Sequence, residues 1–291
     1  AGTGKGKKKG KGKGKGGDDD DEFDNLTGND DENDLSEGIN SVFGSLETNT
    51  INEDKANEAK LLTSEAMSDL LNQKSSMRIK ALHSLLQLLR GVNARVTCDI
   101  LQSNYSEQLL TVISRLLQRQ VSNTTDEAPL LLDLICLISL MLGANQDDFF
   151  NKFEAPLKKL IEEENVGEDI QSKSLFVLGF ICFISSQDSQ SDIWDYVEDI
   201  LVDGPDQIIS MPIVQAVRTW VLLAGIMDDE SVLERSRERV FEAMSRLLGE
   251  ADDIEGRMAA GEGLAYLYEV ADRTAPDSEV SAQELSPIVC F

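Results

Sequence analysis

The sequence is poor in the residues on which compact catalytic and metal sites depend. Its 291 residues include one histidine, His83, and four cysteines, Cys98, Cys136, Cys182 and Cys290. The cysteines are far apart and form no Cys-x-x-Cys pair, which argues against a disulfide framework and against a closed zinc site with clustered ligands. We therefore expect a reducing compartment, with Cys136 and Cys182 as small core residues.

The single histidine also limits the chemistry that the chain can perform. Acid–base or nucleophilic catalysis needs a nucleophile beside a base that a third group holds, and the spacing around His83 supports no such arrangement. Acidic residues occur in runs, such as Glu162 to Glu164 and Asp228 to Glu230, which are typical of solvated faces and helix ends. We expect a protein that is not an enzyme, with no catalytic residues, metal, cofactor or small-molecule substrate.

Aromatic residues, prolines and long apolar runs are scarce as well. The chain is 5% aromatic and 41% hydrophobic and has 6 prolines, a balance that favours Leu- and Ala-rich helices over an all-β fold. The most apolar segment, Leu130 to Leu142, contains Asp133 and is shorter than the roughly 18 residues that cross a bilayer. We expect no membrane insertion and no signal peptide, and we expect Trp194 and Trp220 to be packing residues.

Positive charge is scarce too, since 27 Lys and Arg face 53 Asp and Glu for a net charge of -26. A domain this acidic does not bind a phosphate backbone over its general surface, although a local basic stripe could still do so.

Residues 1–57 form a low-complexity arm with too few apolar residues to offset the entropy of ordering, so we predict disorder there. The arm holds a candidate basic contact for nucleic acid, ribosomes or import receptors, with a solvated tail as the alternative. Its lysines are Lys5, Lys7, Lys8, Lys9, Lys11, Lys13 and Lys15.

Apolar residues at helical spacing begin near residue 58 and continue to about residue 275. The predicted helices are Leu61–Leu71, Ile79–Leu89, Leu109–Leu117, Leu130–Leu142, Phe149–Ile161, Leu175–Ile184, Ile193–Val202, Val214–Ile226, Val232–Leu248 and Ile254–Ala271. We expect Leu130–Leu142 to be buried on most sides and Leu175–Ile184 to be fully buried.

The more apolar helices recur at a regular interval. They begin near Ala128, Asp169, Ser210 and Glu255, 41 to 45 residues apart, which matches the period of HEAT and armadillo repeats. Helix pairs of this length bury their apolar faces by stacking on their neighbours. The sequence therefore predicts an all-α, HEAT/armadillo-like helical repeat solenoid over 58–275, followed by a short tail over 276–291.

Polar residues that interrupt the apolar helices are candidates for partner contact. In a stacked array the apolar helices form an inner row that exposes only a narrow strip. We predict that this strip carries Lys173, Gln215, Arg218, Arg257 and Glu262. The alternative is that these residues only solvate the face or pair within a repeat.

Four segments resemble a known family. Arg257–Glu269, with the sequence Arg-Met-Ala-Ala-Gly-Glu-Gly-Leu-Ala-Tyr-Leu-Tyr-Glu, resembles the signature of the interferon-related developmental regulator family. Ala155–Ile161 resembles its Pro-x-Leu-Lys-x-x-Ile helix, Leu178–Ile184 its buried Gly/Cys/Phe-rich helix, and Thr219–Leu223 its Ala-Trp-x-Leu-Leu segment. The order and spacing agree across about Leu61 to Ala271.

The resemblance implies a non-enzymatic regulator, since family members are associated with transcriptional co-regulation and with the binding and silencing of ribosomes. It implies co-regulator complexes and ribosomes as partners, and we expect a cytoplasmic and nuclear location. Family members carry a basic region after the repeats, whereas this sequence ends at Phe291, soon after Glu269. The alternative is an adaptor of the karyopherin or phosphatase-scaffold kind, which uses the same architecture to hold a protein client.

Two glycines stand inside the last predicted helix. Gly261 and Gly263 each lower helix propensity by about 1 kcal/mol, so we expect both to allow the close approach of a neighbouring helix. On this interpretation Gly261→Leu overpacks the last repeat and costs about 1 to 3 kcal/mol.

Overall fold

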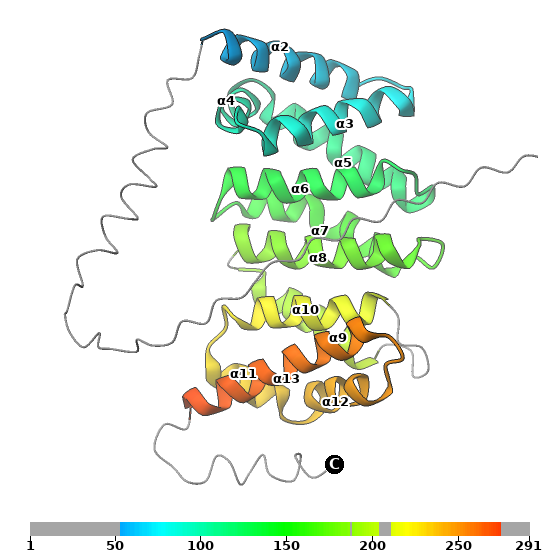
Figure 1. Cartoon of the computed structure of the whole chain (residues 1–291), viewed down its shortest axis with the longest axis vertical. Coiled ribbons are helices and arrows are strands. Elements are labelled where there is room, and N and C mark those ends of the chain that lie inside the picture. Colours follow the sequence, from blue (N-terminus) through cyan, green and yellow to red (C-terminus); the bar gives the residue numbers. More distant parts are fainter. Residues whose placement is uncertain (1–52, 187, 204–210, 275–291) are drawn as a thin grey trace, which may run out of the picture. The chain divides into compact units, whose positions relative to one another are not determined.

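The structure is a computed structural model that describes residues 53–186, 188–203 and 211–274, except for the side chains of residues 53, 54, 203, 237 and 238 (Figure 1). Every regular element within these ranges is a helix, so the all-α prediction is confirmed for them. Residues 1–52 of the predicted disordered arm, with its seven lysines, and the predicted tail over 276–291 lie outside the described residues, whereas residues 53–57 of the arm are helical, so the prediction of disorder is wrong for them.

The elements follow one another with short connections. The α-helices are α2 (Glu53–Leu70), α3 (Ser75–Arg90), α4 (Ala94–Ile100), α5 (Ser106–Ser122), α6 (Ala128–Leu142), α7 (Asp147–Glu162), α8 (Glu168–Ser185), α9 (Gln190–Asp203), α10 (Met211–Ala224), α11 (Asp229–Arg235), α12 (Phe241–Glu250) and α13 (Ile254–Thr274). Two π-helical segments, η1 (Leu101–Tyr105) and η2 (Ser236–Val240), connect α4 to α5 and α11 to α12.

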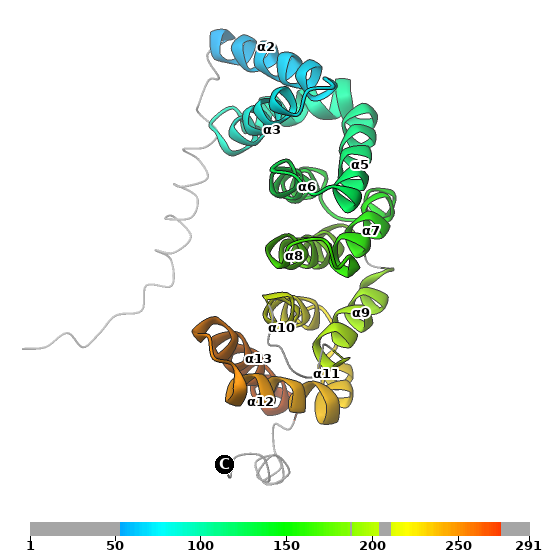
Figure 2. The same ribbon diagram turned by 90° about the vertical axis from the view of Figure 1, so that its right-hand side faces the viewer.

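The helices from α3 onward stand in two rows (Figure 2). The inner row consists of α3, α6, α8, α10 and α13, and the outer row contains α5, α7, α9 and α11. Each inner helix packs on the next inner helix, and α6, α8, α10 and α13 also pack on the outer helix that precedes them. The last four inner helices begin 40, 43 and 43 residues apart, close to the predicted interval, and they stack as predicted for a HEAT-like repeat.

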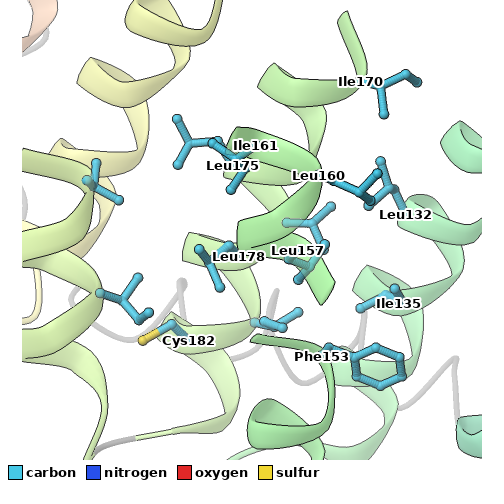
Figure 3. Close-up of a cluster of buried hydrophobic side chains, with 14 of the residues drawn as sticks. Leu132, Ile135, Phe153, Leu157, Leu160, Ile161, Ile170, Leu175, Leu178 and Cys182 are labelled. Carbon is cyan, nitrogen blue, oxygen red and sulfur yellow. The ribbon is translucent and has the colours of Figure 1, made fainter. Parts of the chain in front are cut away.

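The core lies between the two rows. Figure 3 shows this for α6, α7 and α8, where Leu132, Leu157 and Leu178 come from the three helices and meet with Cys182 in one apolar cluster. All four are buried, and burying a leucine side chain contributes about 1.5 to 3 kcal/mol. Cys182 is therefore the core residue that we predicted, whereas Cys136 is half-buried at the edge of the core.

The two tryptophans of the chain pack against each other. Trp194 of α9 and Trp220 of α10 are fully buried, and their ring centroids lie 5.5 Å apart. Tilted aromatic pairs at this separation are favourable. The prediction that both are packing residues is confirmed.

Glycines set the spacing of the inner helices at two points. A Cβ atom on Gly179 of α8 would overlap the side-chain methyl of Thr219 in α10. One on Gly263 of α13 would lie 3.0 Å from a methyl carbon of Val217 in α10 and 2.7 Å from the sulfur of Met244 in α12. Nothing lies within 4 Å of a Cβ atom built on Gly261. The expectation of close approach is thus right for Gly263 and wrong for Gly261, because residues two positions apart in a helix point about 200° away from each other.

Two other parts of the chain differ from the predicted pattern. The segment from α4 through η1 is helical although we predicted no helix there, and the single helix predicted over Val232–Leu248 is divided into α11, η2 and α12. In addition, α2 begins at Glu53, before the predicted start of the helical region.

Side-chain hydrogen bonds between neighbouring repeats join residues at a limited separation in sequence. Two of them mark the range, Tyr196 to Glu162 at 34 residues and Ser75 to Glu127 at 52 residues. The polar contacts of the stack are therefore made between elements that follow each other closely in the chain.

Candidate functional site

The five residues predicted for the exposed strip all lie on the inner row. Lys173 is on α8, Gln215 and Arg218 are on α10, and Arg257 and Glu262 are on α13. Lys173 and Gln215 are half-buried, and the other three are exposed. Their places agree with an inner-row strip, but their role in partner binding stays a prediction.

Lys173 takes part in an ionic bridge across three inner helices. Its Nζ lies 2.7 Å from Oδ1 of Asp133 on α6, and Nη2 of Arg90 on α3 lies 3.3 Å from Oδ2 of the same carboxylate. All three side chains are partly exposed, so each pair contributes about 0 to 1 kcal/mol. Asp133 interrupts the most apolar helix of the chain because it bridges its two neighbours.

The next two inner helices are joined in a similar way. Arg218 of α10 lies 3.0 Å from Glu255 of α13, and the side-chain amide of Gln215 donates to Oγ1 of Thr219 at 3.2 Å. Arg257 donates to the carbonyl oxygens of residues 251 and 252, at 2.6 and 3.1 Å, and so holds the turn before its own helix. Four of the five predicted residues thus make contacts that organise the inner row itself.

A more deeply buried ion pair holds the start of the stack. Arg78 of α3 donates two hydrogen bonds to the carboxylate of Glu127, just before α6, from Nη2 to Oε1 at 2.6 Å and from Nε to Oε2 at 3.2 Å. Ser75 donates to the same carboxylate. The side chains of Arg78 and Glu127 are 11% and 2% exposed. Such a pair is a weak source of net stability, but losing one partner leaves the other charge buried. Sequence reasoning missed this pair because the two residues are 49 positions apart.

Within the described ranges, the titratable groups with shifted pKa values do not form a catalytic arrangement. Burial raises the pKa of both Cys136 and Cys182 to about 12, and it also raises the pKa of Cys98. These thiols therefore stay protonated at neutral pH and are poor nucleophiles. Burial raises the pKa of Glu198 as well, although Arg239 and the indole of Trp220 oppose that shift.

No group of three or more His, Cys, Asp and Glu side chains in the part of the chain that the structure describes is placed to hold a metal ion. Its helices do not combine the length and the apolar composition that crossing a membrane requires. The single histidine, His83, is exposed on α3.

Comparison with known proteins relates the chain to one family. Residues 25–287 match the family model described as interferon-related developmental regulator. The chain is 23% identical to human interferon-related developmental regulator 1 and 24% identical to the rat protein, in each case over 201 residues, 63% of this chain and 43% of the relative. It thus spans less than half the length of these curated relatives.

Among solved structures, the crystal structure of an engineered protein matches with a TM-score of 0.38 and 16% identity, over 77% of this chain and 94% of that protein. The family model, in contrast, covers most of the sequence, including all described helices. The chain therefore belongs to the interferon-related developmental regulator family.

Proposed function

We propose that this protein is a non-enzymatic regulator of gene expression that acts by binding other macromolecules. The family match over residues 25–287 carries the proposal, because the family is one of developmental regulators. The stacked helices support it, since helical repeats of this kind present extended surfaces that proteins use for binding. Fold alone does not define a partner.

Two partner classes follow from the resemblance, transcriptional co-regulator complexes and ribosomes, in the nucleus and the cytoplasm respectively. The exposed strip of the inner row, with Arg218, Arg257 and Glu262 as its exposed predicted contacts, is the proposed docking face. The lysines between Lys5 and Lys15 are proposed as an additional basic contact, which would suit the phosphates of ribosomal RNA.

Sedimentation of the tagged full chain from cell lysate through a sucrose gradient tests this proposal, at low and at moderate salt, with bound partners identified by mass spectrometry. Co-migration with ribosomal particles that weakens as salt rises supports a translational regulator, because contacts to phosphate are salt-dependent. Migration with co-regulator complexes supports a transcriptional role. A variant with serine at all seven arm lysines is the matched control for the basic contact.

Two outcomes of the same experiment would contradict the proposal. Recovery with import cargo or with a phosphatase would instead identify an adaptor. Migration as a free protein at both salt concentrations would remove the support for either regulator class.

A further inference from the structure

Two neighbouring inner helices expose an apolar patch, which consists of Leu137 and Leu140 of α6 and Phe176 and Phe180 of α8. Leu140 is 54% exposed and Phe176 is 39% exposed, while the other two are half-buried. The rings of Phe176 and Phe180 stack with their centroids 5.6 Å apart. The prediction that Leu175–Ile184 is fully buried is thus wrong on this face, because α8 packs on α6, α7, α9 and α10 and leaves one side uncovered.

The two helices that carry the patch run in the same direction (Figure 1). Near their starts, Asp133 of α6 pairs with Lys173 of α8 at 2.7 Å. At the other end, the backbone N–H of Gln146, four residues after α6, donates to the carbonyl oxygen of Ser185, the last residue of α8, at 2.7 Å. Contacts at both ends fix the register of α6 against α8.

This register brings the two halves of the patch together. Leu137 and Leu140 follow Asp133 by four and seven residues, and the two phenylalanines follow Lys173 by three and seven residues. Residues at these spacings share one face of a helix. The leucines and the phenylalanines therefore lie side by side, on the same face as the ion pair between the helices.

Polar residues border the patch on both sides. On α3, the exposed side chain of Arg90 reaches Asp133, one turn before Leu137. On α10, the corresponding positions are Gln215 and Arg218. Large apolar side chains at the surface with a polar border are typical of interaction sites. Of the four patch residues, Leu137 also packs against the core.

The charge beside the patch indicates what kind of partner fits. The segments that follow α6 and α8, residues 143–151 and 186–192, contain Asp147, Asp148, Asp188 and Asp192 and no lysine or arginine. We call these four residues the acidic edge. A partner that covers the patch and reaches this edge gains from positive charge.

We infer that the apolar patch is a docking site for an amphipathic helix of a partner protein, with basic residues at the end that lies over the acidic edge. Each half of the patch extends about 5 to 6 Å along its helix at 1.5 Å per residue, and packed helices stand about 8 to 10 Å apart. Apolar anchors at positions i, i+4 and i+7 of one helix span similar distances. This inference rests on the proposed function, since it names the contact through which such a regulator holds a protein partner.

Fluorescence anisotropy with labelled synthetic peptides tests the inference on the full chain. The probe is a helical peptide with leucine at i, i+4 and i+7 and lysine at its other surface positions. A second peptide replaces the lysines by glutamate, and a third replaces the leucines by serine. We expect only the first to bind well, and we expect its affinity to fall about tenfold or more for the double variant Leu140→Ser/Phe176→Ser, since anchor residues dominate such interfaces.

Matched variants separate the patch from general attraction to an acidic protein. Leu61→Ser/Leu62→Ser changes two exposed leucines on α2 and is expected to leave the affinity unchanged. Asp148→Asn/Asp192→Asn removes two exposed charges of the acidic edge and is expected to weaken binding of the lysine peptide. Circular dichroism and tryptophan fluorescence check that each variant is folded, and Leu140→Ser alone replaces the double variant if that one unfolds.

Several results would overturn the inference. The first is that the lysine peptide does not bind, and the second is that the serine peptide binds as tightly as the lysine peptide. The third is that the lysine peptide binds the α2 variant and the patch variant with the same affinity, and the fourth is that the glutamate peptide binds more tightly than the lysine peptide. The sucrose gradient distinguishes this failure from that of the proposed function. If the peptide does not bind but the chain still co-migrates with ribosomes or co-regulator complexes, only the assignment of the patch is rejected. If the peptide binds but the chain co-migrates with neither complex, only the proposed partner classes are rejected.

Discussion

The close contact between α8 and α10 at Gly179 gives a quantitative test of the packing. A Cβ atom at this position would overlap the methyl group of Thr219, which is buried and whose hydroxyl accepts a hydrogen bond from Gln215. Gly179→Ala therefore forces the two helices apart, and overpacking of this kind costs about 1 to 3 kcal/mol. Alanine also favours the helix by about 1 kcal/mol over glycine, so the net loss is about 0 to 2 kcal/mol.

Gly261→Ala is the matched control, because it makes the same change in the middle of a helix where nothing lies within 4 Å of the new Cβ atom. This variant should gain about 1 kcal/mol from helix propensity alone. The difference in free energy of unfolding between the two alanine variants then isolates the packing cost, about 1 to 3 kcal/mol. The sequence predicted that a larger residue at Gly261 overpacks the last repeat; the structure instead predicts that alanine at this position stabilises the helix.

A second variant tests the identity of the clashing group. Thr219→Ser removes the methyl group and leaves its Cβ atom at 3.5 Å and its hydroxyl oxygen at 3.9 Å from the new carbon, which are ordinary contact distances. Gly179→Ala should therefore be tolerated in the Thr219→Ser background, with a coupling energy of about 1 to 3 kcal/mol in the double-mutant cycle. Urea unfolding, followed by circular dichroism and by the fluorescence of the two buried tryptophans, measures all four proteins. Equal stability of the Gly179 and Gly261 alanine variants, or no coupling to Thr219, would refute the reasoning.

Three further predictions concern other parts of the stack. Glu127→Ala leaves Arg78 almost buried without its partner and should cost about 3 to 5 kcal/mol in urea unfolding; a loss below about 1 kcal/mol would show that the pair is not buried in solution. Gly263→Ala should have a lower Tm than Gly261→Ala, because both gain about 1 kcal/mol of helix propensity but only the new Cβ atom at residue 263 meets a methionine sulfur, at 2.7 Å; equal Tm values would contradict that contact. Burial raises the pKa of Cys136 and Cys182 to about 12, so both thiols stay protonated in the folded protein at pH 9, where unfolded thiols are largely ionised. Iodoacetamide labelling at pH 9, followed by peptide mass spectrometry, should therefore find both cysteines protected. Labelling of the folded protein as fast as in urea would contradict this prediction.

The element order of the helical region could be predicted because its signals are local. The starts of α6, α8, α10 and α13 are set by apolar periodicity and by polar breaks, which lie within a few residues of each helix end. The segment from Ala94 to Tyr105 escaped prediction because Val96, Cys98 and Ile100 alternate with polar residues, which is the period of a strand and not of a helix. Gly261 and Gly263 look equivalent in sequence, and only the rotation of α13 against its neighbours makes one of them tight.

The candidate site was predictable only in part. The sequence indicates that Lys173 and Arg218 lie on exposed strips of inner helices, because each interrupts an apolar run. Their partners, Asp133 and Glu255, are 40 and 37 positions away, and such pairings depend on how successive helices stack. The apolar patch could not be predicted for the same reason, since a phenylalanine in an apolar helix gives no sign of facing outward until the packed sides are known.

The limited sequence separation of the bonds between repeats has a consequence for how the protein comes apart. Bonds such as those of Tyr196 to Glu162 and Ser75 to Glu127 link each helix pair to the adjacent pair, so removing one pair releases only its immediate neighbour. Unfolding can then proceed from a terminus inward, as partly opened states in which the remaining pairs stay intact. Proteolysis during gentle denaturation should accordingly yield fragments that end between helix pairs, and the α8–α10 junction, where Gly179 meets Thr219, is where a destabilising change would divide the stack into two shorter ones.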